Sequence, residues 1–275
     1  MLMNAVAGLL VGIIVGMTGV GGGSLMAPIM ILVFGQSPAT AVGTDLWFAG
    51  ITKLVGGTVH HSVGKGIDWR VLRRMCMGSL PAAAITLYIL WSNQSSPIKG
   101  GVITHALGGV LIMTAIATLF RHKFIAWSRT LQDRRGDHPS RGQLTLTVLS
   151  GAVLGVLVML TSVGAGALGV TMMLCLYPLR LADTKRLVAT DIAHAVPLTL
   201  LGGMGNLLMG SVPAALQSGD WFIGTVNVTL LGGLLLGSIP GIIIGSVATR
   251  WIGETLLRRV LAAVLVAVGL KLLLS

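Results

Sequence analysis

The chain has 275 residues, of which 54% are hydrophobic and only 10% charged, with a formal net charge of +11. Soluble domains carry about a quarter charged residues, so this composition excludes an ordinary soluble domain and predicts a multi-pass membrane protein. The positive charge does not indicate nucleic-acid binding, because the basic residues lie in short loops between apolar segments rather than on one folded face.

Ten apolar segments follow one another along the chain. A helix needs about twenty apolar residues to cross a bilayer, and the second segment of each half is too short for this. We therefore expect each half to be a hairpin of two part-length helices followed by three spanning helices. The segments cover 3–20, 24–35, 40–61, 71–91 and 101–120 in the first half, and 143–162, 166–178, 186–209, 223–248 and 256–274 in the second.

The two halves share two motifs. Val20-Gly21-Gly22-Gly23 has a counterpart in Val163-Gly164-Ala165-Gly166. About twenty residues after each, Ala41-Val42-Gly43-Thr44-Asp45 matches Leu187-Val188-Ala189-Thr190-Asp191. Duplicated halves with interrupted helices and polar residues at depth are typical of secondary transporters. The sequence thus predicts a first transmembrane repeat over 1–120, a basic cytoplasmic linker over 121–142 and a second repeat over 143–275.

The distribution of Lys and Arg predicts the orientation. Basic residues concentrate in four loops, at 62–74, 121–142, 180–186 and 250–259, whereas the loop 210–222 has none. Because basic loops stay in the cytoplasm, we expect these four loops inside and both chain termini outside the inner membrane. An odd number of segments separates the starts of the two halves, so the all-helical repeats are predicted to be inverted.

Four ionisable side chains fall well inside apolar segments: Asp45, Lys53, Asp191 and His194. A charge at the bilayer centre costs roughly 2.5–3.5 kcal/mol even on a lenient insertion scale. Asp45 and Lys53 are eight residues apart on one helix and therefore share one face of it. Asp191 and His194 are three residues apart and share one face of the matching helix. Two interpretations remain: an internal ion pair that stabilises the bundle, or a substrate or coupling-ion site. The repeated Thr-Asp pair favours the second.

The glycine clusters at 21–23 and 164–166 interrupt apolar runs, and also allow two interpretations. They can be tight turns, or their backbone N–H groups at the start of a following helix can bind an anion. Residues 164–169 also spell GxGxxG, but no strand precedes them, so a dinucleotide cofactor is not expected. No GxSxG, HExxH or GxxxxGK[ST] pattern occurs, and neither an enzyme active site, a cofactor nor a metal is predicted.

The run Gly16-Met17-Thr18-Gly19-Val20-Gly21-Gly22-Gly23, followed by Pro28, by Pro38-Ala39-Thr40-Ala41-Val42-Gly43-Thr44 and by Gly66-Ile67-Asp68-Trp69, resembles the TauE/SafE sulfite-exporter family. The second half matches through Val163 to Gly166 and Val188 to Asp191, so the resemblance covers nearly the whole chain. It implies secondary transport of small anions, including sulfite and organosulfonates, usually as export driven by the proton gradient.

Together these features predict a site at the meeting point of the two glycine clusters. Lys53 would supply the positive charge for an oxyanion, while Asp45, Asp191 and His194 are candidate proton carriers. A membrane-embedded sulfur-handling factor or enzyme, and uptake of a small carboxylate, are the alternatives, and the sequence leaves a homo-oligomer open. The predicted substrate-binding residues are Gly21, Gly22, Gly23, Thr44, Lys53, Gly164, Ala165, Gly166 and Thr190.

Overall fold

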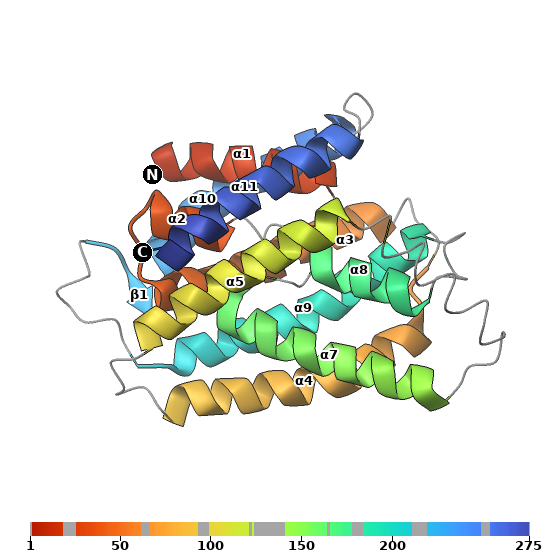
Figure 1. Ribbon diagram of the computed structural model, residues 1–275. Coiled ribbons are helices and arrows are strands. Elements are labelled where there is room, and N and C mark those ends of the chain that lie inside the picture. The colour runs from red at the N-terminus through yellow and green to blue at the C-terminus, as the bar shows by residue number, and fades with distance from the viewer. Residues whose placement is uncertain are drawn as a thin grey trace.

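The computed structural model describes residues 2–18, 26–61, 66–92, 99–120, 123, 141–163, 166–177, 184–210, 219–248 and 254–274. These residues form ten helices and one short hairpin (Figure 1). The first half holds α1 (Leu2–Thr18), α2 (Met26–Leu32), α3 (Pro38–His61), α4 (Trp69–Ser92) and α5 (Lys99–Leu119). The second holds α7 (Arg141–Thr161), α8 (Ala167–Leu176), α9 (Thr184–Leu208), β1 (Phe222–Ile223), β2 (Val226–Asn227), α10 (Val228–Ala248) and α11 (Glu254–Leu274).

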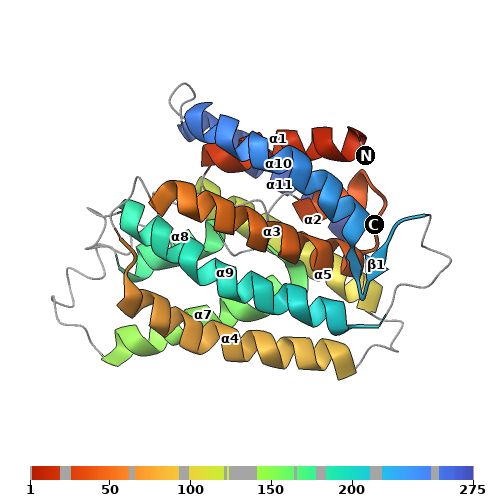
Figure 2. The same cartoon turned by 180° about the vertical axis from the view of Figure 1, so that it is seen from behind.

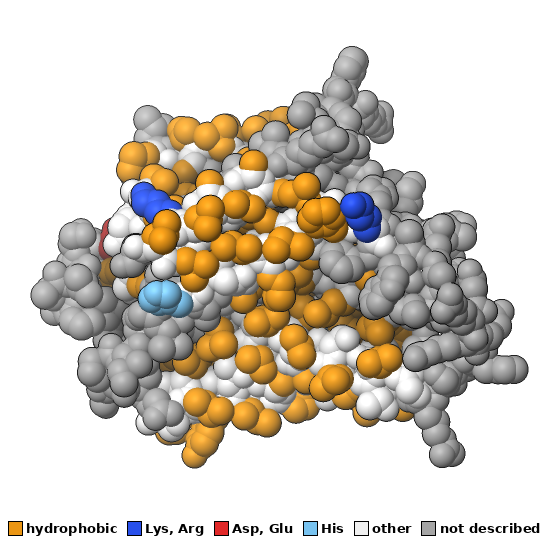
Figure 3. Space-filling model, in the orientation of Figure 1, with side chains coloured by type: hydrophobic (Ala, Val, Ile, Leu, Met, Phe, Trp, Pro, Cys, Tyr) orange, Lys and Arg blue, Asp and Glu red, His pale blue; other side chains and the backbone are white. Residues whose placement is uncertain are grey.

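The predicted helical membrane class is confirmed. Among the described residues, four helices are long and apolar enough to cross a membrane: Trp69–Ser92, Gly142–Thr161, Arg186–Leu208 and Val228–Gly245. Large apolar side chains cover the face formed by α4, α5, α7 and α11 (Figure 3). Exposed apolar side chains on these helices include Ile85 of α4, Ile116 of α5 and Leu149 of α7. Apolar side chains on the outer face of a helical bundle are what a lipid environment requires.

The short second segments are confirmed, with two corrections. Helix α2 has 7 residues and α8 has 10, so they are about 10 and 15 Å long and cannot span a hydrocarbon core of about 30 Å. In the second half, the helix that precedes α8 is not part-length as expected, because Gly142–Thr161 of α7 is long enough to cross the membrane. The segment predicted to begin at residue 223 begins as a hairpin instead, and α10 starts only at Val228.

Helices α3 and α9 lie side by side in the middle of the bundle, with α1 and α10 on one flank and α4 and α7 on the other (Figure 2). The two flanking pairs pack closely because glycines face carbonyl groups of the opposite helix, where any side chain would overlap the backbone. These glycines are Gly8 and Gly12 of α1, which face Leu234 and Ser238 of α10, and Gly151 and Gly155 of α7, which face Met75 and Ser79 of α4.

The helix termini gather at two opposite ends of the bundle (Figures 1 and 2). One end, here called the basic end, holds the end of α3 and the starts of α4, α7 and α9, with Arg70, Arg73, Arg74, Arg141 and Arg186. The other end, here called the far end, holds the start of α3 and the ends of α4, α9 and α11. Because α3 and α9 begin at opposite ends, they are antiparallel.

If the basic end faces the cytoplasm, Ser37 at the start of α3 is accessible from outside and Arg74 is not. We expect a Ser37→Cys variant, with Cys76 and Cys175 replaced by Ala, to react with an impermeant maleimide on intact cells. Arg74→Cys in the same background should react only after permeabilisation. Labelling of position 74 on intact cells would reverse the orientation. The same orientation places Ser218 and Ser275 outside and Arg135 in the cytoplasm, but these three residues lie outside the described residues.

Candidate functional site

The four ionisable side chains predicted at membrane depth all lie in the core between α3 and α9. Asp45 is 0%, His194 1%, Asp191 2% and Lys53 4% exposed. Asp45 is the eighth residue of α3 and Asp191 the eighth of α9, so each lies about 10 Å along its helix. Because the two helices start at opposite ends, the carboxylates lie towards opposite ends of the core.

Lys53 connects the two carboxylates. It comes two turns after Asp45 on α3 and therefore lies towards the part of the core that contains Asp191. Its ammonium interacts most strongly with the carboxylate of Asp191 and less with that of Asp45. His194 also lies within electrostatic range of Lys53. The structure thus brings together residues that are more than a hundred positions apart in the sequence.

Asp45 faces the region where α7 ends. The Ser162 hydroxyl and the backbone of Ala27 lie next to its carboxylate. Neither reaches hydrogen-bond geometry, and both carboxylate oxygens of Asp45 are buried without a partner among the described residues. The Ser162 hydroxyl is likewise buried and unpartnered there. Two buried polar groups that face each other unsatisfied are costly, and such pairs gather at functional sites.

Ser162 also has an unusual backbone. Its φ of 59° lies in the left-handed region, where a residue other than glycine is strained by about 1–3 kcal/mol. The sequence contains a signal for this conformation, because Thr161-Ser162-Val163 aligns with Thr18-Gly19-Val20 and a glycine stands at the corresponding position. Ser162 was not among the residues predicted for the site, although it lies two residues before the glycine cluster 164–166.

Asp191 lies against the start of α8. A Cβ added to Gly169, the third residue of α8, would overlap Oδ1 of Asp191, so only glycine leaves room for the carboxylate. This Oδ1 is buried and has no hydrogen-bond partner among the described residues. The predicted site residue Gly166 is buried and is the N-cap residue of α8. The structure therefore brings Asp191, Lys53 and the first turn of α8 into one region.

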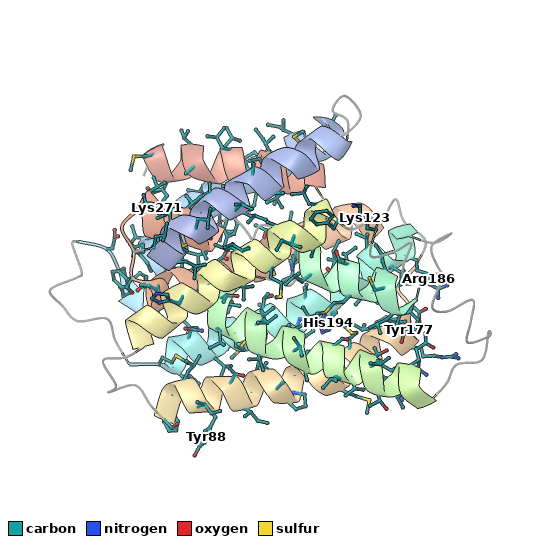
Figure 4. The ribbon with its side chains drawn as sticks, in the orientation of Figure 1. Tyr88, Lys123, Tyr177, Arg186, His194 and Lys271 are labelled. Carbon is teal, nitrogen blue, oxygen red and sulfur yellow. The ribbon has the colours of Figure 1, made fainter. Side chains whose placement is uncertain are left out.

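His194 reaches from α9 towards α4, in the interior of the bundle (Figure 4). Its Nε2 lies 2.8 Å from the hydroxyl of Ser79, and its Nδ1 is buried without a partner among the described residues. Lys123 and Arg186 lie towards the basic end, whereas Lys271 lies towards the far end (Figure 4). The charged groups near the centre are thus separate from the basic residues at the helix ends.

The two predicted threonines already have partners. The hydroxyl of Thr44 accepts a hydrogen bond of 3.0 Å from the backbone N–H of Asn227, which precedes α10. The hydroxyl of Thr190 accepts one of 2.9 Å from the backbone N–H of Asp68, which precedes α4. Each threonine fixes the start of a helix from the other half, so its contact with a substrate stays a prediction. Gly21, Gly22, Gly23, Gly164 and Ala165 lie outside the described residues.

Among the described residues, no group of three His, Cys, Asp or Glu side chains could hold a metal ion. The chemistry of the site is that of one ammonium, two carboxylates, one imidazole and hydroxyl groups in an apolar surrounding. Such a set can bind a small charged species and exchange protons.

Comparisons with known proteins give a consistent result. The family model described as "Sulfite exporter TauE/SafE" matches residues 4–272. The probable membrane transporter protein YjnA of Bacillus subtilis is 36% identical, over 97% of this chain and 97% of its own length. The probable membrane transporter proteins MJ0441 of Methanocaldococcus jannaschii and YdhB of Bacillus subtilis are 26% and 25% identical, over 98% and 96% of this chain and 94% and 96% of their own lengths. No solved structure matches the chain.

The strain at Ser162 leads to a stability prediction. Ser162→Gly should raise the free energy of unfolding by about 1 kcal/mol, because glycine adopts a φ of 59° without strain. Ser162→Ala keeps the strain and serves as the matched control, which should not be stabilised in this way. Thermal unfolding of the purified protein in detergent measures both effects. If Ser162→Gly is less stable than the wild type, the hydroxyl supports the fold.

Proposed function

Since this chain belongs to the TauE/SafE sulfite exporter family, we propose that it is a secondary transporter that moves a small oxyanion, such as sulfite or an organosulfonate, across the inner membrane. The family and the names of the relatives indicate a membrane transporter rather than an enzyme. The observation that carries the proposal is Lys53, a buried cation between the central helices α3 and α9.

A buried lysine suits an anionic substrate for an electrostatic reason. An anion that crosses the membrane loses its hydration, and a fixed positive charge in an apolar surrounding replaces part of what is lost. Lys53 provides this charge, and the N-terminal end of α8 provides a second, partial one. In the proposal, the two glycine clusters and the hydroxyls of Thr44 and Thr190 complete the binding site.

The proposal includes two inverted repeats, 1–120 and 143–275, joined by the linker 121–142. Corresponding contacts support it: helix pair α1–α10 has its counterpart in α7–α4, and α3 and α9 pack on each other. The hydrogen bond from Asn227 to Thr44 likewise corresponds to that from Asp68 to Thr190. A third correspondence lies in the sequence, where Gly78-Ser79-Leu80-Pro81 matches Gly237-Ser238-Ile239-Pro240.

In such a protein, transport proceeds by rocking one repeat against the other, so that the site opens to each side in turn. Asp45, Asp191 and His194 are the proposed proton carriers. Export is the direction that the family name suggests, and the proton gradient is its proposed driving force. Uptake of a small carboxylate by the same fold is the alternative, since a carboxylate and a sulfonate both place negatively charged oxygens near Lys53.

Flux into proteoliposomes tests the proposal. We expect purified protein to transport at least one of sulfite, isethionate (2-hydroxyethanesulfonate) and acetate, and we expect Lys53→Ala to abolish this flux while the variant still accumulates in the membrane. Lys271→Ala is the matched control, because it removes an exposed lysine at the end of α11 and should leave the flux unchanged.

Two outcomes would count against the role of Lys53. Normal flux through Lys53→Ala would make the lysine structural. A variant that does not accumulate would support the internal ion pair, because removal of one partner leaves the other charge buried alone. Transport of acetate without sulfite or isethionate would favour the carboxylate alternative.

A further inference from the structure

The first turn of α8 has the properties of an anion site. Backbone N–H groups in the first turn of a helix have no acceptor within the helix, and the helix dipole makes this end positive. Gly169 leaves the space beside this turn open, since any Cβ would fill it. Lys53 adds a full positive charge in the same region, because it lies two turns after Asp45 on α3, towards the part of the core that contains Asp191, and within electrostatic range of that carboxylate.

The group that occupies this space is the side chain of Asp191. Its Oδ1 lies against Gly169, is buried, and has no hydrogen-bond partner among the described residues. An aspartate held there for structural reasons alone would be expected to satisfy both oxygens, because a buried acceptor without a donor destabilises the fold. The carboxylate therefore lies where an anion is favoured, but it is bound incompletely.

We propose that Asp191 is an internal substitute for the transported oxyanion. The anion takes the place of the Asp191 carboxylate between Lys53 and the first turn of α8, and Asp191 takes up one proton from solution in the same step. This inference rests on the proposed function, because it requires that the protein binds a small oxyanion.

Charge balance explains why the proton is needed. With Asp191 ionised, Lys53 and Asp191 together are neutral. An anion of single charge that joined them would leave a net negative charge in an apolar core. Protonation of Asp191 restores neutrality, since the anion then balances Lys53. Anion binding and proton uptake are consequently linked, and each promotes the other. When the proton crosses the membrane together with the anion, an inward proton gradient drives uptake, so this linkage supports the uptake alternative rather than proton-driven export.

The other groups near Asp191 are less suited to this role. His194 lies on the same face of α9, but its Nε2 is engaged with Ser79 of α4. On α3, Asp45 lies towards the opposite end of the core, and Lys53 is the cation itself. Asp68, whose backbone N–H binds Thr190, is also buried, but its Oδ1 accepts hydrogen bonds from the backbone N–H groups of Arg70 and Val71 at the start of α4. Helix α8 has no charged residue and Cys175 near its end, and α7 has only Arg141, at its start. Cys76 of α4 is half-buried, and the arginines of that helix, Arg70, Arg73 and Arg74, lie near its start at the basic end.

Calorimetric titration of the purified full-length protein with isethionate tests the inference. Isethionate keeps a single negative charge throughout the range of about pH 5 to pH 8, so any pH dependence comes from the protein. Titrations in two buffers that differ in ionisation enthalpy should show about one proton taken up per anion bound at the upper end of this range. The apparent Kd should rise up to about tenfold per pH unit there.

Asp191→Asn keeps the shape of the side chain and removes its charge. This variant should bind isethionate without proton uptake, with a Kd that does not change with pH and is lower than that of the wild type at about pH 8. His194→Gln should retain the proton uptake. Gly169→Ala should weaken binding by more than about tenfold, because its Cβ fills the anion space, whereas Gly109→Ala, where a Cβ has open space, should not.

Binding of isethionate by the wild type with no proton uptake would overturn the inference and leave the proposed function intact. Persistence of the proton uptake in Asp191→Asn would also overturn the inference, because His194 or Lys53 would then take up the proton. Loss of the uptake in His194→Gln would identify His194. Failure of both the wild type and Asp191→Asn to bind isethionate, sulfite or acetate at any pH would instead overturn the proposed function. The wild-type titration alone decides the first case, so the test does not depend on the folding of a variant.

Discussion

The structure depends on one electrostatic constraint: a lysine and two aspartates lie in the middle of an apolar helical bundle. Lys53, Asp45 and Asp191 are each less than 5% exposed, and removing such charges from water is costly unless they compensate one another. The helices α3 and α9 must lie side by side for this compensation, because the charges come from both of them. They must also be antiparallel, because only then does Lys53, two turns after Asp45 on α3, lie towards Asp191 near the start of α9. The remaining helices pack around α3 and α9 and hold these two helices in position.

Two kinds of contact hold them there. Glycines let α1 approach α10 and let α7 approach α4 until backbone meets backbone. Thr44 and Thr190 bind the residues that begin α10 and α4, so the central helix of each half is tied to a flanking helix of the other half. The hydroxyls of these threonines join the halves, and any motion between the halves must either break these bonds or leave the joined residues in contact.

The sequence predicted the features that depend on local patterns. Helix positions, the shortness of α2 and α8 and the burial of Asp45, Lys53, Asp191 and His194 follow from runs of apolar residues and from spacing along one helix. The contacts between helices could not be predicted in this way, because periodicity along one helix says nothing about which side chain of another helix it meets. The pairs Asp191–Gly169 and His194–Ser79 are of this kind. Ser162 was detectable in principle from the alignment of the halves, since glycine stands at its counterpart, Gly19.

The central claim is that the buried charges form a transport site and not only an internal ion pair. The most direct measurement combines stability and flux for the double variant Lys53→Met/Asp191→Leu, in which apolar side chains of similar size replace both charges. Replacement of a complete buried ion pair by apolar side chains is often neutral or stabilising, by about 1–4 kcal/mol. We therefore predict a protein that unfolds at the wild-type temperature or above it and transports no oxyanion in proteoliposomes. Flux at the wild-type rate through this variant would contradict the account, because the charges would then have no part in transport.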